Sequence, residues 1–255
     1  MDTKAFLIDL DGVLYVGDHA ISGATETIAM LDEQGYPYRF VSNTTRKSRT
    51  TIAARLDRLG FSIPVSHIFT PAIAAISLIR NEGYTRCFLL TTGDVDNDFA
   101  EAEIKSADTD ADGVIIGDAG DNFTYGNLTK AMRLILDGAG LIALERDRYW
   151  MGENGLMLSA GPFVAALEYA TSTCARVVGK PSGNFFALAL SDMGARPEET
   201  LMIGDDITTD IGGAREAGMR GVLVKTGKYR NEAVASSGII PDYILDSIGH
   251  LREIL

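Results

Sequence analysis

Cysteine and histidine are scarce in this chain, whose 255 residues include two cysteines and three histidines. Cys87 and Cys174 lie far apart and form no CxxC pair, and the histidines are scattered, so a zinc site built from these residue types is not expected. The pattern does not indicate a disulfide framework either. We therefore predict free thiols in a reducing compartment and a cytoplasmic protein.

Long apolar runs are also missing. The longest apolar stretch, residues 73–79, is far shorter than the roughly 18–20 residues that a membrane-spanning helix needs. Met1 to Lys4 lead directly into residues 5–9 without the basic flank, long apolar segment and cleavage site of a signal peptide, so none is expected. We predict no membrane partner.

Basic residues are fewer than acidic ones: the chain has 23 Lys and Arg and 35 Asp and Glu, which gives a net charge of −12. An acidic chain repels nucleic acid, so no nucleic-acid partner is expected. A small anionic substrate stays compatible with this charge, because the local field at a site decides its binding. The 46% apolar and 23% charged residues are typical of a globular protein with a buried core.

Short β-rich runs alternate with helical patterns along the chain. Strands are predicted over residues 6–8 and 38–41, and helices over residues 24–34 and around Ile52 to Leu59. Further strands are predicted over residues 87–90, 113–116, 141–144, 176–178, 201–203 and 221–224. This alternation predicts an α/β fold with a Rossmann-like, doubly wound parallel sheet and helices on both faces.

Polar residues follow four of the predicted strands. The four groups are Asp9 and Asp11; Ser42 and Asn43; Gly179, Lys180 and Pro181; and Gly204, Asp205 and Asp206. In open parallel sheets, functional groups gather at the carboxyl ends of the strands. The sequence therefore predicts one shared site at this edge of the sheet.

Five carboxylates would meet there if the strand ends are neighbours. They belong to Asp9, Asp11, Asp205, Asp206 and Asp210. Carboxylates in close proximity raise each other's proton affinity, and a hard cation such as Mg²⁺ compensates for this repulsion. An isolated Asp-x-Asp pair is equally explained by a turn, and Asp206 by helix capping, so both alternatives stay open.

Carboxylates, a hard cation and Lys180 together suit phosphoryl transfer, which depends mainly on positioning and charge neutralisation. An aspartate can also act as the nucleophile and form an aspartyl-phosphate. The second aspartate, two residues further on, can then protonate the leaving group and later activate water.

Four motifs in this order resemble those of the haloacid dehalogenase (HAD) superfamily. Residues 9–15, with Asp9, Asp11 and Gly12, resemble its first motif, DxDGT/V, and residues 41–43 its second. Residues 179–181 are similar to the third motif, and residues 204–206 with Asp210 to the fourth. The resemblance covers nearly the whole chain, and it implies a HAD-fold core.

The long segment between Asn43 and Lys180 has its own α/β alternation. It resembles the large inserted cap of the NagD-like, type IIA subfamily. We therefore expect a discontinuous core over residues 1–79 and 177–255 and an α/β cap over residues 80–176. Residues 204–214 and 224–230 are similar to those of phospholysine phosphohistidine inorganic pyrophosphate phosphatases and of HAD-like proteins containing a hydrolase domain 2. The resemblance also implies a p-nitrophenyl phosphatase, a label often given to bacterial and archaeal members of the subfamily.

The resemblance implies a Mg²⁺-dependent phosphatase, a hydrolase of phosphoric esters that acts on a small phosphorylated metabolite. Asp9 would be the nucleophile and Asp11 the general acid and base. Mg²⁺ would be held by the Asp9 carboxylate, the Asp11 backbone carbonyl and Asp205. Asp206 and Asp210 would lie around these ligands and orient metal-bound waters or Lys180.

The remaining implied roles concern the phosphoryl group. Ser42 and the backbone N–H of Asn43 would bind its oxygens, and Lys180 would balance its charge and that of Asp9. Thr44 would help at the start of the next helix, although capping explains this threonine as well. For Arg146 to Trp150 two interpretations stay open: they select the leaving group, or they form a solvated hairpin. A homodimer that forms through the cap surface also stays open.

Three alternatives remain beside this interpretation. A phosphate-accepting signalling domain is disfavoured because such domains are about half this length and lack the long insertion before the lysine. A HAD-like binding or regulatory protein without activity is disfavoured because Asp9, Asp11, Lys180 and Asp205 are intact. An inorganic pyrophosphatase would use the same residues.

Overall fold

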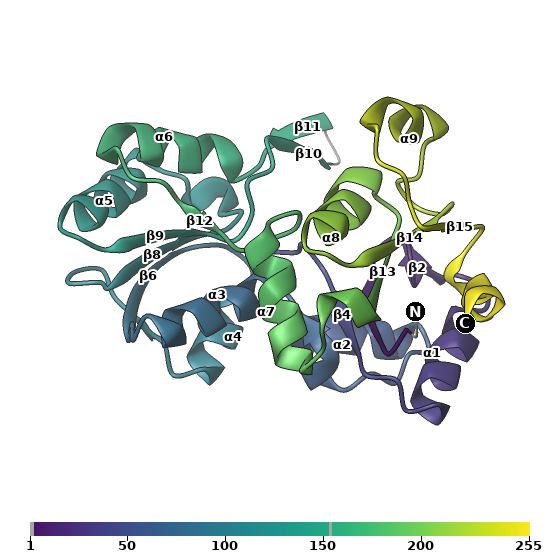
Figure 1. The fold of residues 1–255 in the computed structure, drawn as a ribbon. Coiled ribbons are helices and arrows are strands. Elements are labelled where there is room, and N and C mark those ends of the chain that lie inside the picture. The colour runs from purple at the N-terminus through teal and green to yellow at the C-terminus, as the bar shows by residue number, and fades with distance from the viewer. Residues whose placement is uncertain (1–2, 153–154) are drawn as a thin grey trace. The chain divides into compact units, whose positions relative to one another are not determined.

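The computed structural model describes residues 3–152 and 155–255, and its contacts divide the chain into two compact units. The first unit comprises Met1–Ser42, Ile52–Phe69 and Lys180–Leu255, and the second comprises Asn43–Thr51 and Thr70–Gly179. Figure 1 traces the chain through both units. This division places residues 43–51 and 70–79 with the inserted segment, whereas the sequence suggested a boundary after residue 79.

The first unit is built on a six-stranded parallel sheet in the order β15-β14-β13-β1-β4-β5. The strands are β1 (Ala5–Asp9), β4 (Tyr38–Val41), β5 (Ile68–Phe69), β13 (Thr200–Gly204), β14 (Arg220–Val224) and β15 (Tyr243–Leu245). All five residues of β1 are buried, as expected for a parallel strand covered on both faces. The chain order reverses at β1, and ligands bind at such switch points in doubly wound sheets.

The helices of this unit are placed by short sequence signals. They are α1 (Ala24–Glu33), α2 (Arg49–Arg58, whose first residues belong to the second unit), α7 (Gly183–Met193), α8 (Gly213–Glu216) and α9 (Asn231–Ser237). Helix α1 is followed by Gly35 at φ 70°, a left-handed conformation that glycine adopts without strain. Ser182 begins α7, because its hydroxyl accepts the backbone N–H of Phe185. A small hairpin, β2 (Tyr15–Val16) and β3 (His19–Ala20), follows the first motif.

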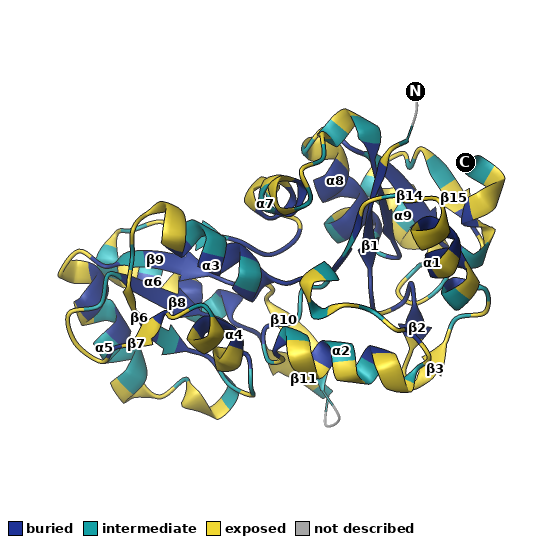
Figure 2. Ribbon diagram, turned by 90° about the horizontal axis from the view of Figure 1, so that it is seen from below, coloured by how far each residue is buried: buried dark blue, intermediate teal, exposed yellow. Residues whose placement is uncertain are grey.

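The second unit has its own parallel sheet, in the order β12-β9-β8-β6-β7. Its strands are β6 (Arg86–Leu90), β7 (Lys105–Ser106), β8 (Gly113–Ile116), β9 (Gly140–Ala143) and β12 (Arg176–Val177). Helices α3 (Pro71–Asn81) and α4 (Asp96–Glu101) lie on one face, and α5 (Tyr125–Leu136) and α6 (Gly161–Thr171) on the other (Figure 1). The central strands of both sheets, such as β1, β8, β9 and β14, are largely buried (Figure 2). The two parallel sheets confirm the predicted α/β class.

An antiparallel hairpin in the second unit exposes an apolar face. Strands β10 (Tyr149–Gly152) and β11 (Gly155–Leu158) pair so that Tyr149 lies opposite Leu158 and Met151 opposite Leu156. These four side chains, which we call the hairpin face, are 58–71% exposed. Trp150 points to the opposite side of the hairpin, where the Arg46 guanidinium lies 5.1 Å from its ring centroid.

No helix within residues 3–152 and 155–255 is both long and apolar enough to cross a lipid bilayer.

A buried carboxylate connects α4 to the start of α2. Asp98 is 1% exposed and accepts the backbone N–H of Arg49 at 3.2 Å. The Arg49 guanidinium lies 3.7 Å from the same carboxylate. Burial raises the pKa of Asp98 to about 6, and the contacts with Arg49 offset only part of this rise.

We predict that Asp98→Asn becomes progressively more stable, relative to the parent protein, as the pH rises from 4 to 7. The folded protein keeps the Asp98 proton up to about pH 6, whereas the unfolded chain loses it near 3.8, so the parent loses stability in this window. The full difference amounts to about 3 kcal/mol, from a shift of about two pKa units. Thermal unfolding of both proteins across this pH range measures it. The exposed Asp137→Asn serves as control, and parallel pH curves for parent and Asp98→Asn would contradict the prediction.

Candidate active site

Asp9 is the last residue of the central strand β1 and is 8% exposed. Its Oδ1 accepts a hydrogen bond from Lys180 Nζ at 2.5 Å. Burial raises the pKa of Asp9 to about 7, although the Lys180 charge acts in the opposite direction. The side chain therefore sits at a strand end where its protonation depends strongly on nearby positive charge.

Lys180 joins two carboxylates that come from different parts of the chain. Besides Asp9, its ammonium donates to Asp210 Oδ1 at 2.7 Å, and Lys180 is 5% exposed. Burial alone would lower the pKa of Lys180, but the carboxylates of Asp210 and Asp9 hold it above its usual value. The lysine is thus a fixed positive charge inside the acidic site.

Asp205 directly follows β13 and is held by the loop after β14. Its Oδ2 accepts the backbone N–H of Lys228 at 2.6 Å, and burial raises its pKa to about 6. The hydroxyl of Thr226 donates to the carbonyl of Gly12, which ties this loop to the first motif. A side chain on Gly227 would overlap both the Asp205 carboxylate and Gly12, so the close approach requires glycine there.

Asp206 and Asp210 have different surroundings. Asp206 caps the π-helical turn η4 (Ile207–Gly212), because its carboxylate accepts the backbone N–H groups of Thr208 and Thr209. This is the capping geometry that the sequence left open. Asp210 lies inside that turn, is 2% exposed and contacts Lys180.

Three carboxylates form a group that suits a hard cation. Asp9, Asp205 and Asp210 each offer one oxygen, and these oxygens lie within 4.8 Å of one another. An all-oxygen donor set of buried carboxylates is the kind that Mg²⁺ prefers. Asp210 belongs to this group, whereas the sequence placed it around the ligands together with Asp206.

Asp11 lies outside the carboxylate group and its side chain is exposed. Its backbone forms a bridge with Tyr15, and the N–H of Gly12 donates to the Tyr15 carbonyl at 2.7 Å. Burial and then the Asp11 charge raise the pKa of Tyr15 to about 12. The Arg55 guanidinium lies 4.6 Å from the Tyr15 ring centroid, a cation–π distance.

The predicted phosphate-binding residues fall in both units. Ser42 directly follows β4 and is the last residue of the first chain segment of the first unit. Its backbone N–H donates to the Phe69 carbonyl at 3.2 Å. Asn43 and Thr44 belong to the second unit, where they line a cavity of about 200 Å³ with Arg46, among others. The first unit thus brings together Asp9, Lys180, Asp205 and Asp210.

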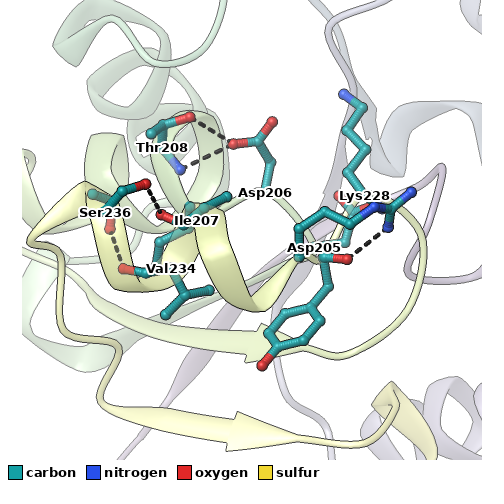
Figure 3. A pocket seen from close by; sticks show the side chains of 11 residues that line it. Asp205, Asp206, Ile207, Thr208, Lys228, Val234 and Ser236 are labelled. Atoms are coloured by element: carbon teal, nitrogen blue, oxygen red, sulfur yellow. Dashed lines mark hydrogen bonds between the residues drawn. The ribbon is translucent and has the colours of Figure 1, made fainter.

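Sequence reasoning missed Lys228. Its side chain is exposed and lines a cavity of about 280 Å³ that Asp205 and Asp206 also line (Figure 3). Burial of its stem would lower the pKa of Lys228, but nearby carboxylates, that of Asp206 first, hold it above its usual value. Applying the strand-end rule to β14 would have found it, because Lys228 lies in the loop that follows Val224.

The doubly wound parallel core, the inserted α/β unit and the buried carboxylate–lysine centre together define a class of α/β protein with a cation- and phosphate-type site at the carboxyl edge of its sheet. Residues 6–105 match the family model of haloacid dehalogenase-like hydrolases, and residues 177–251 match the HAD-hydrolase-like model. The chain is 48% identical over 228 residues to haloacid dehalogenase-like hydrolase domain-containing protein 2 of Bos taurus, covering 89% of this chain and 86% of the relative. It is 41% identical over 259 residues to the phospholysine phosphohistidine inorganic pyrophosphate phosphatase of Xenopus laevis, covering 99% and 94%.

Solved structures agree with these relatives. The p-nitrophenyl phosphatase from Archaeoglobus fulgidus superposes with a TM-score of 0.91 over 100% of both chains at 27% identity. NagD from E. coli K-12 gives a TM-score of 0.87 over 98% of both chains, also at 27% identity. The chain belongs to the haloacid dehalogenase-like hydrolase family. It is a NagD-like phosphatase with the HAD fold and an inserted cap.

We predict that Gly227→Ala strongly reduces phosphatase activity, because the added methyl group displaces the Asp205 carboxylate. Gly238→Ala is the matched control: Gly238 has φ 69° and Gly227 has φ 57°, but a methyl group on Gly238 meets no atom within 4 Å. Both variants lose about 1 kcal/mol of stability from the left-handed backbone, and only Gly227→Ala loses turnover. Steady-state hydrolysis and thermal unfolding separate the two effects. Equal activities in the two variants would show that the close approach is not required.

Proposed function

We propose that the protein is a Mg²⁺-dependent phosphatase that hydrolyses a small phosphorylated metabolite through an aspartyl-phosphate on Asp9. The observation that carries this proposal is the buried Lys180, which holds Asp9 at 2.5 Å and Asp210 at 2.7 Å within a group of three converging carboxylates. Such a centre can bind a hard cation and still keep one carboxylate as nucleophile.

Asp9, Asp205 and Asp210 are the carboxylates that would hold Mg²⁺, together with the Asp11 backbone carbonyl that the family resemblance implies. When bound, Mg²⁺ neutralises charge on the phosphoryl oxygens and orients the group for in-line attack. Asp206 is engaged in capping the η4 turn and is therefore proposed as a positioning residue for Asp210, whose Oδ2 accepts the Asp206 backbone N–H at 3.2 Å.

In the first step, a carboxylate oxygen of Asp9 attacks the phosphorus, and the bond between phosphorus and the leaving-group oxygen breaks. The Asp11 carboxyl group donates its proton to that oxygen. Lys180 offsets the charge that Asp9 shares with the phosphoryl group, and Ser42 with the backbone N–H of Asn43 binds phosphoryl oxygens. Asp11 suits a proton carrier because its side chain is exposed to solvent two residues after Asp9.

In the second step, Asp11, now a carboxylate, removes a proton from water. The water oxygen attacks the phosphorus, the bond to the Asp9 oxygen breaks, and inorganic phosphate leaves. Asp9 is restored as a carboxylate and Asp11 as the acid. Thr44, at the start of the segment after Ser42, is proposed to assist in holding the phosphate.

The relatives support a range of small substrates. The name of the Xenopus laevis relative includes phospholysine, phosphohistidine and inorganic pyrophosphate, and the Archaeoglobus fulgidus structure is of a p-nitrophenyl phosphatase. We propose that the substrate is a small phosphorylated metabolite in the cytoplasm. Inorganic pyrophosphate is the second candidate substrate. The inserted segment, expected over residues 80–176, is proposed as the cap that selects it.

We also propose that two copies meet through the hairpin face, defined above as Tyr149, Met151, Leu156 and Leu158. A two-stranded hairpin is only marginally stable in water by itself, and this one exposes large apolar side chains on one face. The face carries no charge, and two copies of a chain with net charge −12 repel least where charge is absent.

We predict that Asp9→Asn abolishes hydrolysis of p-nitrophenyl phosphate in the presence of Mg²⁺, and that EDTA abolishes it in the parent protein. Asp11→Ala should lose turnover by about 100-fold or more, the usual contribution of a general acid–base, and accumulate phosphate on Asp9. Intact-mass measurement and steady-state kinetics test both. Full activity of Asp11→Ala, or metal-independent activity of the parent, would contradict the proposed mechanism.

We predict that Met151→Asp and Leu156→Asp each convert a dimer into a monomer, because each places a carboxylate on the hairpin face. Leu136→Asp is the control, since Leu136 is 60% exposed on α5 and lies outside that face. Light scattering after size-exclusion chromatography measures the mass. A monomeric parent, or a dimer that survives both substitutions, would rule out this interface.

A further inference from the structure

Lys228 has a fixed backbone and a free side chain. Its backbone N–H donates to Asp205 Oδ2 at 2.6 Å. Arg230 Nη1 donates to the carbonyls of Gly227, at 3.1 Å, and of Tyr229, at 2.6 Å, so the loop around Lys228 is tied on both sides. These contacts hold the Cα of Lys228 beside the carboxylate group and leave the ammonium uncommitted.

The ammonium of Lys228 forms no ion pair with any of the residues that the structure describes. Its neighbour Lys225, three residues earlier, behaves differently and pairs with Asp246 at 2.9 Å. The Lys228 side chain is exposed, and in Figure 3 it extends to the same side of the pocket as the carboxylate of Asp206. Lys228 therefore presents a positive charge without an ion-pair partner among the described residues, at the edge of the carboxylate group.

The cavity that Lys228 lines lies beside the catalytic carboxylates. It has a volume of about 280 Å³ and is lined by Asp205, Asp206, Thr208, Lys228, Arg230 and Ser237, among others. Neither Asp9 nor Lys180 is among its lining residues. A phosphoryl group on Asp9 would be next to Lys180, whereas a group in this cavity would meet Lys228, whose charge also acts on Asp206 and Asp9.

We propose that the Lys228 ammonium binds a second anionic group of the substrate, a phosphate or a carboxylate on the leaving-group side, and so selects substrates with anionic leaving groups. This inference rests on the proposed function and names the substrate class for the same site. Lys180 is already committed to Asp9 and Asp210, and Arg230 to backbone carbonyls. Among the residues that the structure describes, Lys228 is thus a cation beside the carboxylates that can pair with a ligand without giving up a hydrogen-bonded or ion-paired side-chain partner.

Non-hydrolysable phosphonates test this proposal by direct binding. Ethylphosphonate carries the phosphonate alone, phosphonoacetate adds a carboxylate, and methylenediphosphonate adds a second phosphonate. Titration calorimetry in excess Mg²⁺ measures their dissociation constants for the parent, Lys228→Met, Lys228→Arg and the control Lys225→Met. Comparison of phosphonoacetate with methylenediphosphonate shows whether Lys228 prefers a carboxylate or a phosphonate as the second group.

We expect the parent to bind one or both of the doubly anionic probes about 10-fold or more tightly than ethylphosphonate, as a charge-assisted contact implies. Lys228→Met should remove most of this difference, with a smaller loss for ethylphosphonate. Lys228→Arg should restore much of it, and Lys225→Met should match the parent. For hydrolysis, Lys228→Met should raise KM for pyrophosphate more than for p-nitrophenyl phosphate.

Two results would overturn the inference. An unchanged preference in Lys228→Met would show that Lys228 does not bind the second group. Equal losses for all three probes would show that Lys228 acts only on the general charge of the site. If the parent neither hydrolyses p-nitrophenyl phosphate nor binds any phosphonate, the proposed function fails as well, which distinguishes that case from the first two.

Discussion

A buried lysine between two buried carboxylates is the interaction on which the rest of the site depends. Without the Lys180 ammonium, Asp9, Asp205 and Asp210 would place three carboxylate oxygens within 4.8 Å of one another with no positive side chain between them. The ion pairs connect three parts of the chain through Lys180, the residue that follows the inserted unit. They connect it to Asp9 at the end of β1 and to Asp210 in the η4 turn. Removing one partner of such a buried group leaves an uncompensated charge, so the fold and the site are stabilised together.

Much of the core could be predicted because its signals are local. Strands such as β1 and β13 are short continuous apolar runs, and the polar residues that follow them mark the carboxyl edge of the sheet. The family resemblance then supplied roles that no local pattern contains. The sequence could not distinguish Asp206 from Asp210, because the distinction arises from the η4 turn, which directs Asp210 toward Lys180 and leaves Asp206 as its cap.

The features that the sequence did not reveal depend on contacts between distant residues. The strand-end rule places Lys228 after β14, but its contact with Asp205 depends on the pairing of β14 with β13 and on a backbone hydrogen bond. The two-residue strand β5 is too short for periodicity to identify. Residues 43–51 belong to the second unit through contacts such as the Arg46 pair with Asp118 at 2.9 Å, which local sequence does not indicate.

Protons and a cation compete for the same oxygens in this site. Burial raises the pKa of Asp9 to about 7 and that of Asp205 to about 6, so these carboxylates take up protons as the pH falls below neutral, and a bound metal would have to displace those protons. Lys180 supplies one permanent positive charge, which is too little for three carboxylates. An acidic protein can therefore attract an anionic phosphate only when a cation and the lysines reverse the local charge. The negative net charge of the whole chain then repels an anionic phosphate, whereas the site with its cation bound attracts it.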